Sequence, residues 1–243
     1  RALIPQLRGY FLDEPNARSS HFQPTPRGGG LVFVAISAVL SGMVLLSGQG
    51  FAAASLSLLA TPLALVGLLD DRHSLPASLR YGVQLSTAAF MIVVSPLAQR
   101  LFLVFPSGSW LNLPFLVLLL IAVTAVINFT NFMDGLDGLV AGCMAVTIAA
   151  LAIALAAPWP LWVLVGSLLG FLLWNWSPAK MFMGDVGSTF LGAVFAGLVL
   201  QASSWPEAFG YLMVATPLLG DAFFCVLRRL LAGQRVFQAH RLH

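Results

Sequence analysis

The sequence predicts an all-α integral membrane protein with about eight transmembrane helices, and three observations lead to this fold class. Hydrophobic residues make up 59% of the 243 positions, and the mean hydropathy is +0.91. Only 9% of the residues are charged, whereas a soluble domain carries about 25%. Long apolar runs follow one another along the chain. These features exclude an ordinary soluble domain.

Eight apolar runs are candidates for membrane-spanning helices. A helix needs about 17–25 residues to cross the roughly 30 Å hydrocarbon core. In chain order the runs cover residues 31–48, 51–69, 81–99, 111–129, 138–157, 161–176, 186–203 and 209–227. All of them fit that length except 161–176, which is slightly short.

The charged residues predict how the loops are placed. Eight spans set successive loops alternately on the two membrane faces, and all of the 12 Lys and Arg except Arg100 fall on the face that carries both termini. By the positive-inside rule this face is cytoplasmic. All nine Asp and Glu except Glu207, and all four His, lie there too. We therefore predict an active site at the cytoplasmic face.

Two adjacent carboxylates end the second run, in the stretch GLLDDRHSLPASLR at residues 67–80. An Asp at this place can simply cap a helix, and Ser-Leu-Pro can begin the next one. Adjacent carboxylates repel each other, however, which favours a nearby cation or metal ion. Asp70 and Asp71 are therefore candidate catalytic residues, with Arg80 as a nearby cation.

Four oxygen-bearing side chains recur at three-residue intervals in INFTNFMDGLDGLVAG, residues 127–142: Asn128, Asn131, Asp134 and Asp137. If the helix continues through them, they form one slowly drifting stripe. Gly135 and Gly138 would let a ligand approach the backbone closely. The alternative is a polar helix end capped by glycine. Hard oxygen ligands favour Mg²⁺ or Mn²⁺ over zinc or copper.

A third polar stretch, GFLLWNWSPAKMFMGDVGSTFLG at residues 170–192, holds Asn175, Lys180, Phe182 and Asp185. Its Gly-Asp-x-Gly-Ser turn can present N–H groups to an anion. It is not a Walker A loop, because the GxxxxGK[ST] spacing is missing. Phe182 is either a stacking platform or an interfacial anchor, and the residues alone favour the anchor.

Three further polar features of the sequence are candidates for function. PTPRGGG, residues 24–30, is either a phosphate-facing nest or the flexible start of a helix. Asp221 lies inside the last run, where a carboxylate is costly unless it serves a function. The terminal QAHRLH offers His240, Arg241 and His243 to an anion or to lipid headgroups. Together with the other stretches, these residues favour phosphoryl chemistry with a metal ion.

The chain resembles the polyprenyl-phosphate N-acetylhexosamine-1-phosphate transferases, glycosyltransferase family 4. It shares, in the family's order, DD at 70–71, NxxNxxDGxDGL at 128–139, WNxxPAKxFMGDxGSxxLG at 174–192 and HRxH at 240–243. The resemblance implies a Mg²⁺-dependent enzyme that transfers a sugar-1-phosphate from a UDP-N-acetyl sugar to undecaprenyl phosphate. UMP and a lipid-linked diphosphosugar are the implied products.

The resemblance also implies roles for individual residues. The expected metal ligands are Asp185 and Asn131. The expected nucleotide-binding residues are Gly135, Leu136, Asp137 and Phe182. The expected diphosphate-binding residues are Arg80, His240, Arg241 and His243. The expected catalytic residues are Asp70, Asp71, Asp134, Asn175 and Lys180. Phe182 would stack on uracil, which replaces its interpretation as an anchor.

Two departures separate the chain from the peptidoglycan branch of the family. HRLH stands where that branch has a His triplet, and Lys180 stands where it has Glu. The stretch RSSHFQPTPRGGG resembles the transferases that initiate O-antigen and capsule synthesis. Initiation of a cell-envelope polysaccharide, such as lipopolysaccharide O-antigen, is therefore expected. The phospho-N-acetylmuramoyl-pentapeptide translocase is the alternative.

Residues 1–243 are expected to form a single transmembrane transferase domain in the bacterial inner membrane. The family implies one helix before Arg1 and at least one after His243, so the chain is expected to be a fragment. The expected partners are a UDP-N-acetyl sugar, undecaprenyl phosphate and membrane lipid. A homodimer is possible, and no nucleic acid partner is expected.

Two mechanisms and one other class of protein stay open. In the preferred single displacement, Asp70 orients the lipid phosphate, which is largely dianionic at pH 7, while Asp71 supports the metal ion or Lys180. A double displacement would use Asp70 as a covalent nucleophile. An ion-coupled transporter would also carry intramembrane acids, but its site would lie near the membrane midplane.

Overall fold

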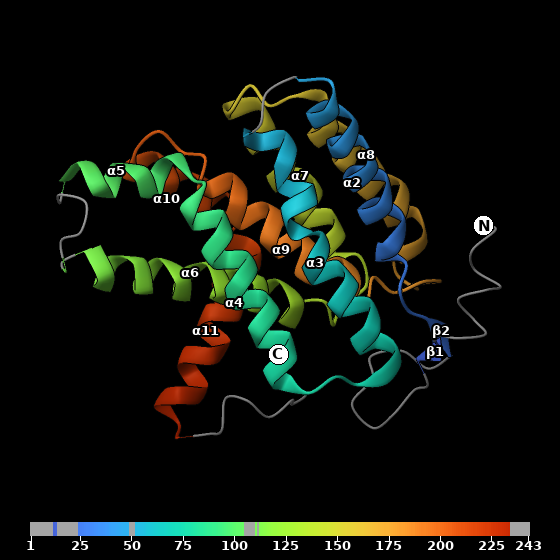
Figure 1. Ribbon diagram of the computed structural model, residues 1–243. Helices are drawn as coiled ribbons and strands as arrows, with labels where there is room; N and C mark the ends of the chain where they lie inside the picture. The colour runs from blue at the N-terminus through green and yellow to red at the C-terminus, as the bar shows by residue number, and fades with distance from the viewer. Residues whose placement is uncertain (1–11, 14–23, 49–51, 105–109, 111, 234–243) are drawn as a thin grey trace.

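The computed structural model describes residues 12–13, 24–48, 52–104, 110 and 112–233 of the chain. This part of the molecule contains ten helices and one short hairpin (Figure 1). The helices are α2 (Gly30–Leu46), α3 (Ala52–His73), α4 (Ala77–Val93), α5 (Pro96–Val104), α6 (Asn112–Phe132), α7 (Leu139–Ala154), α8 (Trp159–Asn175), α9 (Asp185–Val199), α10 (Trp205–Val214) and α11 (Thr216–Leu231). The antiparallel strands are β1 (Leu12–Asp13) and β2 (Thr25–Pro26). The predominance of helix confirms the all-α part of the predicted fold class.

Helix α9 lies at the centre of the bundle (Figure 1). It packs against α2, α3 and α6, and every residue from Val186 to Leu198 is buried. Its sequence, DVGSTFLGAVFAGLV, is almost entirely apolar or small, and a helix that is apolar on all sides needs neighbours or lipid around it. The surrounding helices therefore hold Asp185, the first residue of α9, against their own polar ends.

Glycines let the neighbouring backbones approach α9 closely. A Cβ atom on Gly67 of α3 would lie 2.5 Å from the carbonyl carbon of Asp185. A Cβ atom on Gly30 of α2 would lie 2.5 Å from the Cα atom of Gly187. Neither position accepts a larger side chain unless α9 moves. These contacts set the position of the first turn of α9 relative to α2 and α3.

Helices α2, α4, α7 and α9 are shorter than the predicted spans. Among the described residues, α6, with 21 residues, is the one single helix long and apolar enough to cross a membrane, and the bent pair of α10 and α11 is a second candidate. Helices α2, α7, α8 and α9 are apolar but have 17 residues or fewer, which gives a length of about 25 Å or less. The eight predicted spans are therefore not confirmed.

Two predicted runs are divided between separate helices. The sequence predicts one helix over 209–227, but α10 and α11 are separate and their axes differ by 87°. Pro217 lies at the start of α11, where a proline fits, whereas inside a helix it would remove a hydrogen bond. Similarly, the run 81–99 divides between α4 and α5, and α5 begins with Pro96.

The polar helix ends gather at one end of the bundle. Helices α3, α6 and α8 end there, and α4, α7 and α9 begin there. Hydrogen bonds join the end of α6 to the start of α9, the end of α3 to the start of α9, and the end of α8 to the start of α7. The motifs separated in sequence therefore meet in space.

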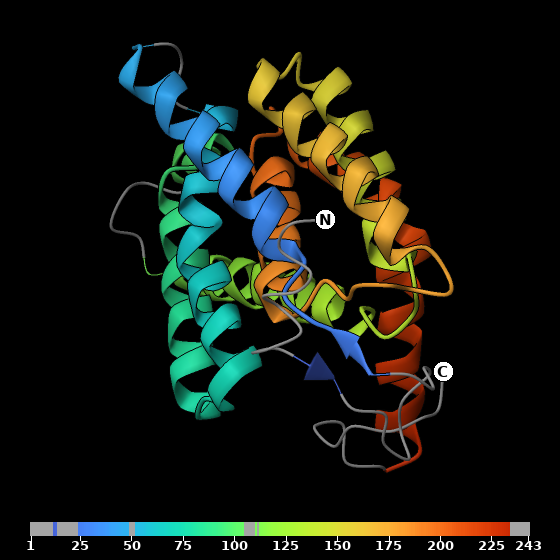
Figure 2. The same ribbon diagram turned by 90° about the vertical axis from the view of Figure 1, so that its right-hand side faces the viewer.

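The segment that leads into α2 runs beside the loop between α8 and α9 (Figure 2). The N–H group of Phe182 donates to the carbonyl of Pro26 at 2.9 Å, and the N–H group of Gly29 donates to the carbonyl of Phe182 at 3.0 Å. A third bond of 3.0 Å runs from Gly30 N–H to the Met183 carbonyl. The two segments pair as adjacent strands do.

Candidate active site

The two expected metal ligands are direct neighbours. The Asn131 Nδ2 atom, in the last turn of α6, donates to Asp185 Oδ1 at 2.9 Å and to Ser188 Oγ at 2.9 Å. Asp185 and Ser188 both lie in the first turn of α9. The structure thus brings Asn131 and Asp185 together as the sequence motifs predict. The motif reasoning did not single out Ser188, whose hydroxyl is part of the same network.

Asp71 caps the start of α9. Its carboxylate accepts hydrogen bonds from the backbone N–H groups of Asp185 at 3.2 Å and of Val186 at 3.4 Å. These groups belong to the first turn of α9, where N–H groups have no partner within the helix and the helix dipole favours an anion. Gly184 has φ +77°, and a Cβ atom there would lie 2.5 Å from Asp71 Oδ2. Both facts explain a glycine directly before Asp185.

Asp70 forms an ion pair with Arg80 across the α3–α4 turn. Asp70 Oδ2 lies 2.8 Å from an Arg80 guanidinium nitrogen, and Asp70 Oδ1 accepts from the Leu75 N–H group at 2.6 Å. The Asp70 side chain is 10% exposed, whereas that of Arg80 is 42% exposed. Arg80 is thus anchored on one side and accessible on the other. Of the two DD-motif carboxylates, Asp70 thus pairs with Arg80 and Asp71 caps α9. The Asp70 carboxyl also lies close to that of Asp185.

The predicted stripe of four polar side chains is wrong in its second half. Helix α6 ends at Phe132, so Asp134 and Asp137 lie in the turn before α7. Two glycines in that turn weaken helix continuation, and the second, Gly138, has φ +75°. Burial of Asp134, together with the negative charges of Asp185 and Asp71, raises the pKa of its carboxyl group well above the usual value of 3.8.

Asp137 and Asn175 join the turn before α7 to the loop after α8. The Asn175 Oδ1 atom accepts from the Gly138 N–H group at 3.1 Å, and its Nδ2 atom donates to the Met181 carbonyl at 3.0 Å. Asp137 Oδ2 accepts from the Ala179 N–H group at 2.9 Å. Both side chains therefore form hydrogen bonds with the backbone of these connecting segments. Nucleotide binding by Asp137 and catalysis by Asn175 stay predictions.

A reciprocal amide pair links α4 to α6 beside the cluster. Asn128 Nδ2 donates to Gln84 Oε1 at 3.0 Å, and Gln84 Nε2 donates to Asn128 Oδ1 at 3.3 Å. Gln84 lies one turn from Arg80 on α4, and Asn128 lies one turn from Asn131 on α6. The pair therefore fixes the two helices at the level of the site. Gln84 was missed because a single glutamine in an apolar run carries no spacing signal.

The other expected site residues are placed less centrally. The Lys180 side chain is exposed, as are Gly135 and Leu136. Phe182 is half-buried in the α8–α9 loop beside Asp185. His240, Arg241 and His243 lie outside the described residues.

The oxygen atoms of the cluster suit a hard divalent cation such as Mg²⁺. Asp185 could ligate it, and so could the side-chain oxygen of Asn131. The Nδ2 atom of Asn131 already donates hydrogen bonds to Asp185 and Ser188. No three described His, Cys, Asp or Glu side chains converge closely enough to hold a metal ion alone. The donor set therefore fits a cation that also takes oxygens from substrate phosphates, which is the usual mode for Mg²⁺.

Comparison with known proteins places this geometry in a family. The family model described as glycosyl transferase family 4 matches residues 53–203, more than half of the chain. A probable undecaprenyl-phosphate N-acetylglucosaminyl 1-phosphate transferase of Bacillus subtilis is 30% identical over 250 residues, 96% of this chain and 68% of the relative. A decaprenyl-phosphate N-acetylglucosaminephosphotransferase of Mycobacterium leprae is 30% identical over 275 residues, 94% of this chain and 67% of the relative.

A third relative belongs to another named activity. The phospho-N-acetylmuramoyl-pentapeptide-transferase of Prochlorococcus marinus is 31% identical over 214 residues, 76% of this chain and 57% of the relative. The chain thus spans 57–68% of the length of these three relatives. The matched residues include the DD, NxxNxxDGxDGL and MGD motifs that build the cluster. The chain belongs to glycosyl transferase family 4.

Proposed function

We propose that the protein transfers an N-acetylhexosamine-1-phosphate from a UDP-sugar to undecaprenyl phosphate, which yields a lipid-linked diphosphosugar and UMP. Membership of glycosyl transferase family 4 supports a sugar-phosphate transferase. The names of the Bacillus subtilis and Mycobacterium leprae relatives support a polyprenyl phosphate acceptor. The observation that carries the proposal is the meeting of Asp71, Asn131 and Asp185 where α3, α6 and α9 join.

The proposed reaction is a single displacement. An oxygen of the lipid phosphate attacks the sugar-linked phosphorus of the donor, and the bond to the bridging oxygen breaks, so that UMP leaves. The lipid phosphate is largely dianionic at pH 7. It therefore needs positioning and charge neutralisation more than it needs a strong base. Mg²⁺ held by Asp185 and Asn131 would neutralise charge on the donor diphosphate.

Other residues of the chain position these groups in the proposed site. Asp71 holds the first turn of α9 in place through its bonds to the N–H groups of Asp185 and Val186. Arg80, anchored by Asp70, keeps an exposed cation beside the cluster for a phosphate. Phe182, proposed to stack on uracil, is fixed in the loop by its backbone bonds to Pro26 and Gly29.

A covalent route through Asp70 is the alternative mechanism. Both oxygens of Asp70 already accept hydrogen bonds, one from Leu75 N–H and one from Arg80. Such contacts stabilise the carboxylate and reduce its reactivity as a nucleophile. They favour single displacement. A sugar phosphate trapped on the protein without lipid acceptor would contradict this choice.

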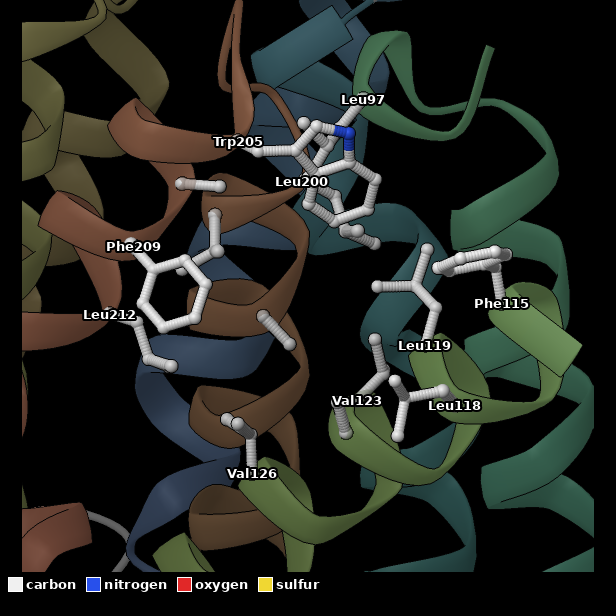
Figure 3. Close-up of a pocket in the computed structure, with 14 residues that line it drawn as sticks. Leu97, Phe115, Leu118, Leu119, Val123, Val126, Leu200, Trp205, Phe209 and Leu212 are labelled. Carbon is white, nitrogen blue, oxygen red and sulfur yellow. The ribbon is translucent and has the colours of Figure 1, made fainter. Parts of the chain in front are cut away.

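An apolar groove gives the acceptor's tail a proposed place (Figure 3). The groove has a volume of about 680 Å³ and lies between α6, α9 and α10. Phe115 and Leu119 line one side of it, and Trp205 and Phe209 line the other (Figure 3). Its lining continues along α6 to Val126, roughly 8 Å along the helix axis from Asn131. A polyprenyl chain in this groove would end near the cluster.

The proposed setting is the bacterial inner membrane, with the cluster at its cytoplasmic face and eight spans in this part of the protein. The gathering of polar helix ends at one end of the bundle supports this arrangement. It disfavours an ion-coupled transporter, whose site would lie near the midplane. Initiation of O-antigen or capsule synthesis is the proposed role. The Prochlorococcus marinus relative makes a phospho-N-acetylmuramoyl-pentapeptide donor the second candidate.

The test is UMP release by the full-length protein in lipid with Mg²⁺, undecaprenyl phosphate and a panel of UDP-N-acetyl sugars that includes UDP-N-acetylmuramoyl-pentapeptide. Release with one donor is expected and would identify the sugar. A ten-carbon prenyl phosphate in place of undecaprenyl phosphate is expected to raise the KM for the acceptor, because the groove would be only partly filled. No release with any donor from folded protein would contradict the proposed function.

A further inference from the structure

Arg27 reaches the edge of the acidic cluster through the strap, residues 24–30, which precedes and enters α2. On either side of Arg27 the strap is pinned to the α8–α9 loop. Pro26 accepts the Phe182 N–H group and Gly29 donates to the Phe182 carbonyl. The N atom of Gly28 lies 3.1 Å from the place of a Cβ atom on Gly184. Arg27 is therefore held beside the loop that presents Phe182 and Asp185.

The Arg27 guanidinium is held on one side and open on the other. It pairs with Asp13 at 2.8 Å, and this contact joins β1 to the residue that follows β2. The Arg27 side chain is 44% exposed. Its positive charge also acts on the carboxylates of Asp71 and Asp134. Arg27 thus stands between an outer carboxylate and the inner acidic cluster.

The chemistry of the site needs cations at this edge. Both proposed substrates carry phosphate, and the cluster contributes four carboxylates, from Asp70, Asp71, Asp134 and Asp185. A guanidinium binds phosphate with two parallel hydrogen bonds, which makes arginine better suited than lysine to this contact. Asp13 places one carboxylate oxygen 2.8 Å from an Arg27 guanidinium nitrogen. A substrate phosphate could replace it without moving the strap.

We propose that Arg27 is a further phosphate-binding residue, and that its guanidinium exchanges Asp13 for a phosphate group of a bound substrate. The inference rests on the proposed function. The shared chemistry is a phosphate, from either the nucleotide donor or the lipid acceptor. The donor is the expected source, because Arg27 lies on the strap that pairs with Phe182, the residue proposed to stack on uracil.

The test compares Arg27→Gln, Arg27→Lys and Asp13→Asn in the full-length protein, with the KM of each substrate measured separately. Arg27→Gln is expected to raise the KM for the UDP-sugar roughly tenfold to a hundredfold, as for a lost hydrogen bond to a charged group. Arg27→Lys should recover part of this loss. Asp13→Asn removes the same ion pair but keeps the guanidinium, so the KM values should rise less than twofold.

The control separates phosphate binding from a structural role. If Arg27 only fastens the hairpin to Asp13, then Asp13→Asn and Arg27→Gln will weaken activity equally, which would overturn the inference. A rise confined to the lipid acceptor's KM would support phosphate binding and change its source. Unchanged KM values for both substrates would overturn it.

A binding measurement distinguishes failure of this inference from failure of the proposed function. UDP binding to wild-type and Arg27→Gln protein needs no turnover. Weaker UDP binding by the variant would support the inference even if wild-type protein released no UMP. Equal UDP binding, with active wild-type protein and unchanged KM values, would overturn the inference alone.

Discussion

Asn175 shows how a single buried side chain can hold two loops of the site together. Its amide accepts a hydrogen bond from the Gly138 N–H group and donates one to the Met181 carbonyl, and all three residues are buried. Asn175→Ala would leave both backbone groups unpaired, at a cost of roughly 1–3 kcal/mol each. We expect a lower unfolding temperature together with lower activity. Lys180→Ala, whose side chain is exposed, is the control and should leave the unfolding temperature unchanged. An Asn175→Ala protein of normal stability would contradict the structural role.

Asp134 makes stability depend on pH in a particular direction. Burial and the charges of Asp185 and Asp71 raise the pKa of this group above 3.8. The folded protein therefore binds the proton more tightly than the unfolded chain does. This contribution is fully present below about pH 4 and is lost as pH rises through the folded-state pKa.

Asp134→Asn removes that dependence. In EDTA, the variant is expected to unfold at a higher temperature than wild-type protein at pH 8, with the difference shrinking as the pH is lowered to 5. Thermal unfolding of both proteins between pH 5 and pH 8 measures this difference in unfolding temperature. A stability difference that stays constant with pH, or that grows on acidification, would contradict the raised pKa.

At the scale of helices, the packing of α3 on α9 controls where Asp185 lies. Gly67→Ala would place a methyl group 2.5 Å from the Asp185 carbonyl carbon, so we expect α9 to shift and both stability and UMP release to fall. Gly82→Ala is the matched control, because Gly82 is also helical and a methyl group added there would meet nothing within 4 Å. It should keep full activity. Equal behaviour of the two variants would contradict this explanation of the close approach.

Much of the helical arrangement follows from hydropathy, but the ends of the helices do not. Long apolar runs predict helices because lipid or a packed core requires internally bonded backbone. The break before Pro217 and the end of α6 at Phe132 depend on local turn chemistry that a run of apolar residues conceals. The stripe interpretation of Asp134 and Asp137 failed for this reason. The pairing of Gln84 with Asn128 depends on how α4 packs on α6, which sequence spacing does not reveal.

At the scale of the whole molecule, the charge distribution predicted that the motifs would meet at one face. Hydrogen bonds between their residues confirm that the DD, NxxNxxDG and MGD motifs share one end of the bundle. The different contacts made by the two aspartates of the DD motif were less predictable. Asp71 caps α9, and Asp70 pairs with Arg80, although the two carboxylates are adjacent in sequence and motif reasoning treats them alike.

The central claim is that the junction of α3, α6 and α9 is the catalytic centre of a sugar-phosphate transferase. The most direct test is UMP release by Asp185→Asn, compared with Glu207→Gln at the start of α10. Asp185→Asn is expected to lose at least about a hundredfold in rate, as when a group that stabilises transition-state charge is removed, while it keeps its fold. Glu207→Gln should release UMP at the wild-type rate. Undiminished UMP release by Asp185→Asn would contradict the assignment of the active site.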